Sequence, residues 1–342
     1  MLGCVGEPLK RSVRPQILIV LAHPELISDD CNAMTAARGW GHMGDLDDIR
    51  RKYAEGIRDV LKLRFSIVLS NDLVEAFAKV KRESFLGPGP WLIRGTRSNI
   101  WQKFTRWLQR SDPTGDWITV DPEQLYRNDA IVAIDASRGL NNGEPRGLAS
   151  WIHFLELHKG DHVLHVGCGL GYYTAIIAEV VGPTGHIIAI EIDPELASRA
   201  GENLACHDHV DVVHGDGGEY VTGPTDAVFV NAGVTHPRSV WLDSLQVGGR
   251  MIMPLTTEYG RGGILKVKRE LRGYAACFIF TTQIFDCVGG RDAELSERLH
   301  DGFKRGAWRL VQSLRREPHD RSTSCWLHGD GFCLSTLPVP DT

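Results

Sequence analysis

Residues 162–193 read HVLHVGCGLGYYTAIIAEVVGPTGHIIAIEID, and this stretch decides the fold class. An apolar run leads into the glycine-rich segment 167–171, after which residues 173–181 carry apolar side chains at helical spacing. Residues 182–185, Gly-Pro-Thr-Gly, end that helix, and residues 187–192 predict a second buried strand with Glu191 near its carboxyl end. The order of strand, glycine loop, helix, strand and acid predicts the nucleotide-type binding unit of an open, doubly wound α/β sheet.

The spacing of the glycines narrows the choice of ligand. Glycine lets the backbone turn tightly and lets a ligand approach the main chain, next to the unpaired N–H groups of a helix start. The loop has the spacing GxGxG and is followed by Tyr172 and Tyr173, whereas dinucleotide enzymes favour GxGxxG. Two tyrosine rings would crowd a pyrophosphate. Taken alone, the loop could also be an ordinary tight turn between a strand and a helix.

Three further apolar runs predict the next strands, and polar residues stand at the ends of two of them. Residues 210–214 precede Asp216, which lies between two glycines and whose carboxylate can accept a hydrogen bond from an adenine amino group. Residues 226–233 predict a fourth strand, and residues 248–255 predict a fifth. Ligands of open parallel sheets bind outside the carboxyl ends of the strands. We therefore expect one crevice to be lined by the glycine loop, Glu191, Asp216 and Asn231.

With these motifs the chain resembles the class I S-adenosylmethionine-dependent methyltransferases, and within them the protein-L-isoaspartate O-methyltransferase family. Residues 162–172 occupy the place of the family's cofactor loop, and residues 212–217 match its adenine-side motif. Residues 73–86 resemble the helix that opens the family's domain, and later segments at 248–255 and 263–268 resemble its closing strands. The similarity spans residues 45–286, apart from an apparent insertion near residues 94–119.

The resemblance implies a Rossmann-like methyltransferase sheet with S-adenosylmethionine as the cofactor. It assigns the methionine part to the glycine loop, the ribose hydroxyls to Glu191, and the adenine to Asp216 and Gly217. The full set of residues expected at the cofactor is His165, Gly167, Cys168, Gly169, Gly171, Tyr172, Glu191, Ile192, Asp216, Gly217 and Asn231.

The chain departs from the family's pattern at two places. Family members usually carry an acidic residue where His165 stands, near the cofactor's ammonium group, and a neutral imidazole accepts a hydrogen bond but supplies no charge. The family's substrate segment has a Thr-Ile-Ser run before a proline, whereas residues 138–145 read RGLNNGEP and lack the hydroxyl. The resemblance therefore predicts methyl transfer, but it does not by itself predict isoaspartyl repair.

Residues 138–146 also suggest how an acceptor would be held. A carboxylate with a pKa of about 4 is ionised at neutral pH, so methyl transfer to it needs no general base. The side-chain amides of Asn141 and Asn142 can donate to a carboxylate without neutralising it, and Arg138 or Arg146 can add charge-assisted contacts. The same Asn-Asn-Gly sequence is also a strong turn signal. We expect Asn141 and Asn142 to position the substrate.

The favoured function is S-adenosylmethionine-dependent O-methylation of a carboxylate, on an isoaspartyl-like peptide or a peptide-derived acid. A small-molecule O- or N-methyltransferase is the second enzyme reading. A cofactor-sensing module without chemistry and a nicotinamide dehydrogenase are further alternatives, although the GxGxG spacing and residues 215–217 count against the dehydrogenase. Fold analogy does not choose the acceptor.

Charge and cysteine content exclude several classes of partner. A net charge of −5 gives no general attraction to nucleic acid or to an anionic membrane. No apolar run approaches the ~18 residues of a membrane span, so we expect a cytoplasmic protein. Eight cysteines in 342 residues are too sparse for a disulfide scaffold. No Cys-x-x-Cys pair occurs, and residues three apart on a strand point to opposite faces, so no metal site is expected.

The two ends of the chain are expected to be appendages of the methyltransferase domain, which we place at residues 43–290. Residues 1–42 read as an extension of uncertain order. Residues 292–316 predict an amphipathic helix, and residues 325–333 predict a hairpin, for which a disulfide is not expected in a reducing compartment. Trp326 and Phe332 on this C-terminal part, residues 291–342, suggest packing on the sheet or a homodimer contact.

Overall fold

The structure is a computed structural model that describes residues 45–94, 116–258, 260–284, 287 and 289–340. The predicted extension at residues 1–42 and most of the predicted insertion lie outside these residues. Four parallel strands form one part of the main sheet, in the order β8-β5-β6-β7. Their bounds are β5 His162–Val166, β6 His186–Glu191, β7 Val210–His214 and β8 Thr225–Val230.

Helices connect β5 to β6, β6 to β7, and β8 to the strand that follows it, as is usual in a doubly wound sheet. Their bounds are α6 Tyr172–Val181, α7 Pro194–Leu204 and α8 Ser239–Ser244. Helix α7 begins after Asp193, whose carboxylate accepts hydrogen bonds from the N–H groups of Glu195 and Leu196, and Pro194 occupies its first turn. Helix α6 ends at Gly182, which has a φ of +68°.

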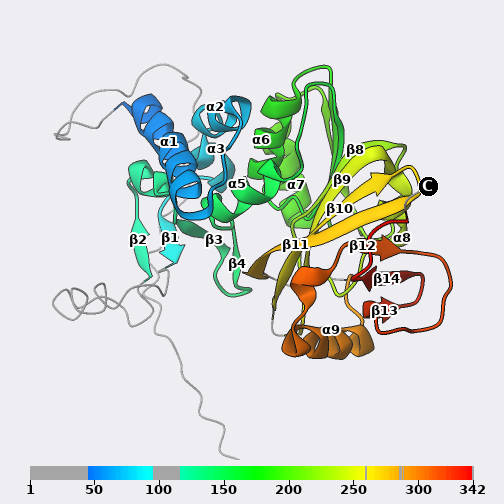
Figure 1. Cartoon of the computed structure of the whole chain (residues 1–342). Helices are drawn as coiled ribbons and strands as arrows, with labels where there is room; N and C mark the ends of the chain where they lie inside the picture. The colour runs from blue at the N-terminus through cyan, green and yellow to red at the C-terminus, as the bar shows by residue number, and fades with distance from the viewer. Residues whose placement is uncertain (1–44, 95–115, 259, 285–286, 288, 341–342) are drawn as a thin grey trace, which may run out of the picture. The chain divides into compact units, whose positions relative to one another are not determined.

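The other half of the main sheet is antiparallel. Strand β9 (Leu245–Thr256) pairs parallel to β8, and then antiparallel to β10 (Arg261–Glu270), which pairs with β11 (Gly273–Gln283). Three short strands near the C-terminus continue the sheet beyond β11 (Figure 1): β12 Ser313–Arg315, β14 Phe332–Ser335 and β13 Cys325–Gly329. The C-terminal residues therefore extend the main sheet at its antiparallel edge, which the sequence did not predict.

The helix predicted at 292–316 is confirmed in its first half and wrong in its second half. Helix α9 spans Ala293–Arg305, capped at its start by the carboxylate of Asp292. Gly306, with a φ of +78°, ends it, because glycine adopts this left-handed conformation at little cost. The chain continues as a 3-10 turn, η2 (Trp308–Leu310), and then as strand β12. The predicted hairpin at 325–333 is confirmed as β13 and β14.

The residues before β5 form helices and a small antiparallel sheet. The helices are α1 Leu46–Phe65, α2 Asn71–Lys79, α3 Arg82–Leu86, the 3-10 helix η1 Pro122–Tyr126 and α5 Pro145–His153. The small sheet has the order β2-β1-β3-β4, with bounds β1 Trp91–Arg94, β2 Trp117–Thr119, β3 Ile131–Asp135 and β4 Leu140–Asn141. The predicted helix at 73–86 is two helices, α2 and α3.

The core lies on both faces of the main sheet, which explains why the residues of the central strands β5, β6 and β8 are mostly buried. Side chains alternate along each strand, so Val163 and Leu164 belong to opposite clusters. Helices α1, α2, α5 and α6 contribute to the cluster that contains Val163, and Trp241 of α8 contributes to the cluster that contains Leu164. None of the helices in the described part of the chain is both long enough and apolar enough to span a bilayer.

Candidate functional site

The glycine loop lies at the carboxyl end of β5 and is fixed to the neighbouring strand. The N–H groups of Gly167 and Cys168 donate to the carbonyl of Ile190, at 2.8 and 3.1 Å. Gly169 and Gly171 have φ angles of +58° and +88°, which L side chains rarely adopt. A Cβ on Gly171 would lie 2.7 Å from Cδ1 of Leu204, whereas a Cβ on Gly169 would have no heavy atom of the described residues within 4 Å. The loop therefore packs tightly against α7 at Gly171 and leaves space beside Gly169.

Glu191 lies against this loop, as predicted from the sequence. Its side chain is 8% exposed, and Oε2 accepts a hydrogen bond of 2.7 Å from the Gly169 N–H. The second oxygen, Oε1, accepts from the N–H of Asp193 at 3.1 Å. Ionised carboxylate oxygens have about two lone-pair sites each, so each oxygen of Glu191 can still accept a ribose hydroxyl. The neighbouring residue, Ile192, is an exposed hydrophobic residue.

Asp216 and Gly217 follow β7 at the same edge of the sheet. Oδ1 of Asp216 accepts from the N–H of Gly218 at 2.7 Å. A Cβ on Gly217 would lie 2.6 Å from Cγ1 of Val166, so the residue after Asp216 must be small for the turn to pack on β5. These features fit the group implied by the family resemblance, because open space beside the loop is combined with a buried acceptor for hydroxyl groups at Glu191 and a partly buried acceptor for an amino group at Asp216.

The segment after β11 passes beside Asp216, which the sequence did not predict. A Cβ on Gly289 would lie 2.5 Å from Oδ2 of Asp216, and the N–H of Cys287 donates to the Gly233 carbonyl at 2.8 Å. Burial and the charges of Asp216 and Glu191 raise the pKa of the Cys287 thiol to about 11. The thiol is therefore neutral and close to both acids. No motif in the sequence marks this segment.

Two residues expected at the cofactor have their side chains in the core. The ring of His165 is fully buried, with Nδ1 2.9 Å from Oγ1 of Thr174 and the ring packed on Phe229. Burial lowers the pKa of His165 to about 3, so the ring is neutral at physiological pH. Tyr172 is 1% exposed, and its hydroxyl lies 3.3 Å from that of Tyr53. Its side chain contributes to packing, so a ligand at this position would meet its backbone.

Cys168 is also buried, and its thiol is neutral. Burial raises its pKa, and the charge of Glu191 adds to the effect. A neutral thiol beside the loop is neither a nucleophile nor a metal ligand. Its contribution at this place is that of a small apolar side chain.

A cavity of about 1140 Å³ lies next to the loop and is lined by Asn141, one of the two asparagines expected to position the acceptor. Asn231 lines it, and the N–H of Asn231 donates to the carbonyl of Val166, the last residue of β5, at 2.8 Å. Asn141 and Arg146 line the same cavity. Apolar side chains complete the wall, among them Phe65, Trp151, Phe280 and Ile284. Asn231 therefore connects the cavity with the crevice at the strand ends.

The two candidate asparagines have different surroundings. Oδ1 of Asn141 accepts from the N–H of Gly143 at 2.8 Å, which leaves its amide group free to donate. Asn142 is 7% exposed and is not among the residues that line the cavity. Its Nδ2 is buried and has no hydrogen-bond partner within the described part of the chain. Arg138 pairs with Asp193 at 2.6 Å, beside the start of α7, whereas Arg146 pairs with Glu144 at 2.5 Å inside the cavity.

A buried arginine that no motif in the sequence marks holds the acceptor segment in place. Arg82 is fully buried, and its guanidinium donates to the carbonyls of Leu125 and Ala130 at 2.6 and 2.8 Å, and to that of Gly143 at 3.5 Å. Its backbone N–H donates to the hydroxyl of Tyr126 at 2.9 Å. A charged residue on the apolar side of a short helix was the signal in the sequence that could have revealed it.

Comparisons with known proteins agree on one family. A model of the family described as protein-L-isoaspartate(D-aspartate) O-methyltransferase matches residues 122–285, so the C-terminal residues lie outside that match. A protein-L-isoaspartate O-methyltransferase of Ignicoccus hospitalis is 40% identical over 160 residues, covering 45% of this chain and 75% of the relative. Protein-L-isoaspartate O-methyltransferase 2 of Archaeoglobus fulgidus is 31% identical over 217 residues, covering 62% and 80%.

Solved structures share the fold. One described as a protein-L-isoaspartate O-methyltransferase aligns with a TM-score of 0.53 and 23% identity, over 78% of this chain and 72% of the other. A putative protein-L-isoaspartate O-methyltransferase from Plasmodium falciparum, in complex with S-adenosyl-L-homocysteine, aligns with a TM-score of 0.50 and 17% identity, over 70% and 97%. The predicted Rossmann-like α/β methyltransferase fold is thus confirmed. From the extent of these matches, the chain belongs to the protein-L-isoaspartate O-methyltransferase family and is an S-adenosylmethionine-dependent methyltransferase.

Proposed function

We propose that the protein methylates a carboxylate of an isoaspartyl-type peptide, and that the cavity lined by Asn141, Arg146 and Asn231 receives this acceptor. The single observation that carries the proposal is the position of Asn231. This residue lines the cavity and is hydrogen-bonded to the end of β5, directly before the glycine loop. A methyl group bound at the crevice would therefore face an acceptor bound in the cavity.

In this proposal the cofactor is held by the residues at the strand ends. Glu191 would accept from the ribose hydroxyls, Asp216 with Gly217 would hold the adenine, and the backbone of 167–171 would hold the methionine part. When bound, S-adenosylmethionine supplies a methyl group on a positively charged sulfur. The neutral state of Cys168 and Cys287 supports this arrangement, because neither thiol would compete with the acceptor as a nucleophile.

The residues of the cavity bind and orient the acceptor. The amide of Asn141 can donate to a carboxylate oxygen, and the guanidinium of Arg146 can add a charge-assisted contact next to Glu144. Neither group removes the charge of the carboxylate, which must remain ionised to attack. The volume of about 1140 Å³ lies near the upper end of the ~300–1,000 Å³ of small-molecule pockets, so the cavity is large enough for a peptide segment.

A small-molecule O- or N-methyltransferase is the second candidate function. One observation favours it, namely the sequence RGLNNGEP at 138–145, which lacks the hydroxyl of the family's substrate segment. In the structure, Oδ1 of Asn141 accepts a hydrogen bond from the N–H of Gly143 within the same segment. The segment therefore presents amide donors where family members present a hydroxyl.

A labelled-methyl assay tests the proposal. The full chain is incubated with methyl-labelled S-adenosylmethionine and an isoaspartyl peptide, with the matching aspartyl peptide as control. We expect label on the isoaspartyl peptide that alkali releases as methanol, because a methyl ester is hydrolysed and an N-methyl group is not. Alkali-stable label, or equal labelling of both peptides, would contradict the proposal. A cytoplasmic location and a homodimer through residues 291–342 stay predictions, and light scattering tests the dimer.

A further inference from the structure

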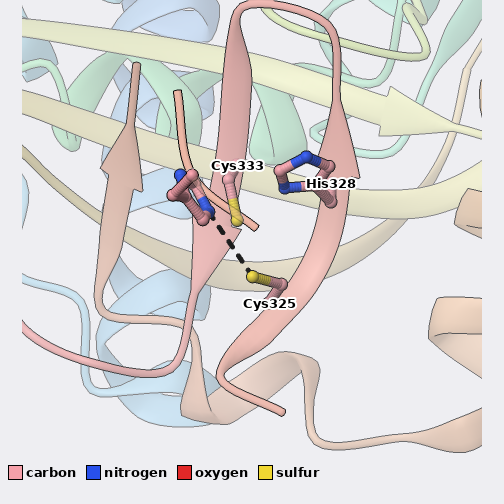
Figure 2. A group of neighbouring side chains, drawn as sticks. Cys325, His328 and Cys333 are labelled. Atoms are coloured by element: carbon pink, nitrogen blue, oxygen red, sulfur yellow. Dashed lines mark hydrogen bonds between the residues drawn. The ribbon is translucent and has the colours of Figure 1, made fainter. Parts of the chain in front are cut away.

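Four side chains with metal-ligand chemistry gather at the last hairpin of the chain, outside the segment that the family model matches. They are His319, Cys325, His328 and Cys333. One ligand atom from each residue can be chosen so that all four atoms lie within 4.8 Å of one another. Figure 2 shows the sulfurs of Cys325 and Cys333 and the ring of His328 directed toward a common centre. The dashed line in this view marks the hydrogen bond between Sγ of Cys325 and Nε2 of His319.

The strand pairing explains why residues three apart share one face. On a regular strand, Cys325 and His328 would point to opposite faces. The register of β13 against β14 shifts between Cys325 and Leu327, so that Cys325 lies opposite Ser335 and His328 lies opposite Cys333. Ser335 and Cys333 are two apart on β14 and share a face. The β-bulge at Trp326 therefore brings Cys325 and His328 to the same side as Cys333.

The separations are close to those of a tetrahedral zinc site. With Zn–S of about 2.3 Å and Zn–N of about 2.0–2.1 Å, tetrahedral ligand atoms lie about 3.3–3.8 Å apart. The Sγ of Cys325 lies 3.5 Å from Nε2 of His319, within this range. The largest separation, 4.8 Å, exceeds it by about 1 Å, which small rotations of the side chains can close.

Hydrogen bonds outside the cluster orient the ligand atoms. Nδ1 of His319 lies 2.8 Å from the carbonyl of Glu317, and because a carbonyl only accepts, this nitrogen carries the hydrogen. Nε2 of His319 therefore presents its lone pair toward Cys325, the arrangement found in most metal-binding histidines. The N–H of Ser322 donates to Sγ of Cys325 at 3.4 Å, a contact that stabilises a thiolate.

His328 supplies an independent sign of a missing partner. Its Nδ1 is buried and has no hydrogen-bond partner among the residues that the structure describes. A buried polar atom without a partner costs free energy, so native structures usually provide one. A metal ion at the centre of the cluster would stabilise this side of the hairpin, on which His328 pairs with Cys333 across the two strands.

We propose that His319, Cys325, His328 and Cys333 bind one Zn²⁺ ion in a closed, structural site. Two thiolates and two neutral imidazoles form a tetrahedral S₂N₂ set, which zinc favours and which leaves no position for a substrate. Binding forms two Zn–S and two Zn–N bonds in place of the bonds between the aqueous ion and its water ligands, and the S–H bonds of the two cysteines break as their protons pass to solvent. The expectation from the sequence that no metal site is present thus gives way to this proposal.

The site would secure an edge of the main sheet. Strand β13 is the last strand of the antiparallel edge, and residues 316–324, which carry His319, have no regular secondary structure. A zinc ion would tie this segment to both strands of the hairpin, because its ligands come from the segment, from β13 and from β14. Metal binding of this kind supplies stability that the small apolar area buried by a short hairpin does not provide.

Metal analysis of the full chain tests the proposal. The protein is purified without chelator, dialysed, and measured by elemental mass spectrometry. We expect one zinc per chain in the wild type and in the control Cys206→Ser, which alters an exposed cysteine outside the cluster. Bound zinc should be lost in Cys325→Ser and in His328→Gln. The same zinc content in Cys325→Ser as in the wild type would overturn the proposal.

Cobalt substitution keeps the test decisive if the variants fail to fold. The wild-type chain is stripped with a chelator and titrated with Co²⁺, and its visible spectrum is recorded. We expect the bands of tetrahedral cobalt and a thiolate-to-cobalt charge-transfer band, and a melting temperature that falls on stripping and recovers with zinc. A wild type that takes up neither metal, or that holds a Cys325–Cys333 disulfide in reducing buffer, would refute the site.

Discussion

Alanine at Gly171 should destabilise the protein, whereas alanine at Gly169 should mainly weaken cofactor binding. A non-glycine residue in the left-handed conformation costs about 1–2 kcal/mol. At Gly171, with a φ of +88°, the new Cβ would also lie 2.7 Å from Cδ1 of Leu204, and overpacking of this kind costs about 1–3 kcal/mol. The expected loss for Gly171→Ala is therefore about 2–5 kcal/mol, a large part of the ~5–15 kcal/mol that stabilises a domain.

Gly169→Ala is the matched control for stability. Its φ of +58° carries the conformational cost alone, about 1–2 kcal/mol, because no heavy atom of residues 45–94, 116–258, 260–284, 287 or 289–340 lies within 4 Å of the new Cβ. That empty space is where we expect the cofactor, so the methyl group should lower the affinity for S-adenosylhomocysteine at least ~10-fold, or ~1.4 kcal/mol.

Urea unfolding and calorimetric titration measure the two effects separately. We expect the unfolding midpoint to fall further in Gly171→Ala than in Gly169→Ala, and the affinity of folded protein to fall further in Gly169→Ala. Equal midpoints would refute the role assigned to the contact between the loop and α7. Wild-type affinity in Gly169→Ala would refute the position assigned to the cofactor.

Three further predictions concern the acid, the arginine and the histidine. Glu191→Gln should weaken binding of S-adenosylhomocysteine at least ~10-fold in calorimetry, because a charge-assisted acceptor is lost, whereas Glu195→Gln on the surface of α7 should not. Arg82→Met removes the donor to the carbonyls of Leu125 and Ala130, which costs about 1–3 kcal/mol for each carbonyl and should lower the urea midpoint. The control Arg58→Met, which removes an exposed ion pair, should leave the urea midpoint unchanged. Burial lowers the pKa of His165 from 6.5 to about 3, so below pH 6.5 the unfolded chain binds a proton that the native protein does not. The free energy of unfolding should then fall by about 1.4 kcal/mol per pH unit from pH 6.5 towards pH 3. Urea unfolding at pH 7 and at pH 5 should show a smaller loss of this free energy between the two pH values in His165→Gln than in the wild type.

The parallel half of the sheet could be predicted because its signals are local. Buried parallel strands are continuous apolar runs, and the glycines at 167–171 are required by their own positive φ angles. The convergence of Glu191 with Gly169 followed from the rule that strand ends share one edge of the sheet.

The side-chain orientations could not be predicted, because they depend on packing between distant elements. Tyr172 points into the core since α6 packs on the helices before β5, where Tyr53 lies. The C-terminal helix was predicted too long although Gly306 was visible as a possible C-cap, because the amphipathic spacing continues beyond it. The metal-ligand cluster was missed because a bulge at Trp326 changes which side chains share a face.

A crystal structure of the full chain with S-adenosylhomocysteine and an isoaspartyl peptide tests the central claim most directly. We predict that the adenine lies at Asp216 and Gly217, the ribose hydroxyls at Glu191, and the sulfur next to the glycine loop, facing a peptide carboxylate at Asn141. A nucleoside bound away from Glu191 and Asp216, or a peptide bound outside the cavity that Asn231 lines, would contradict it.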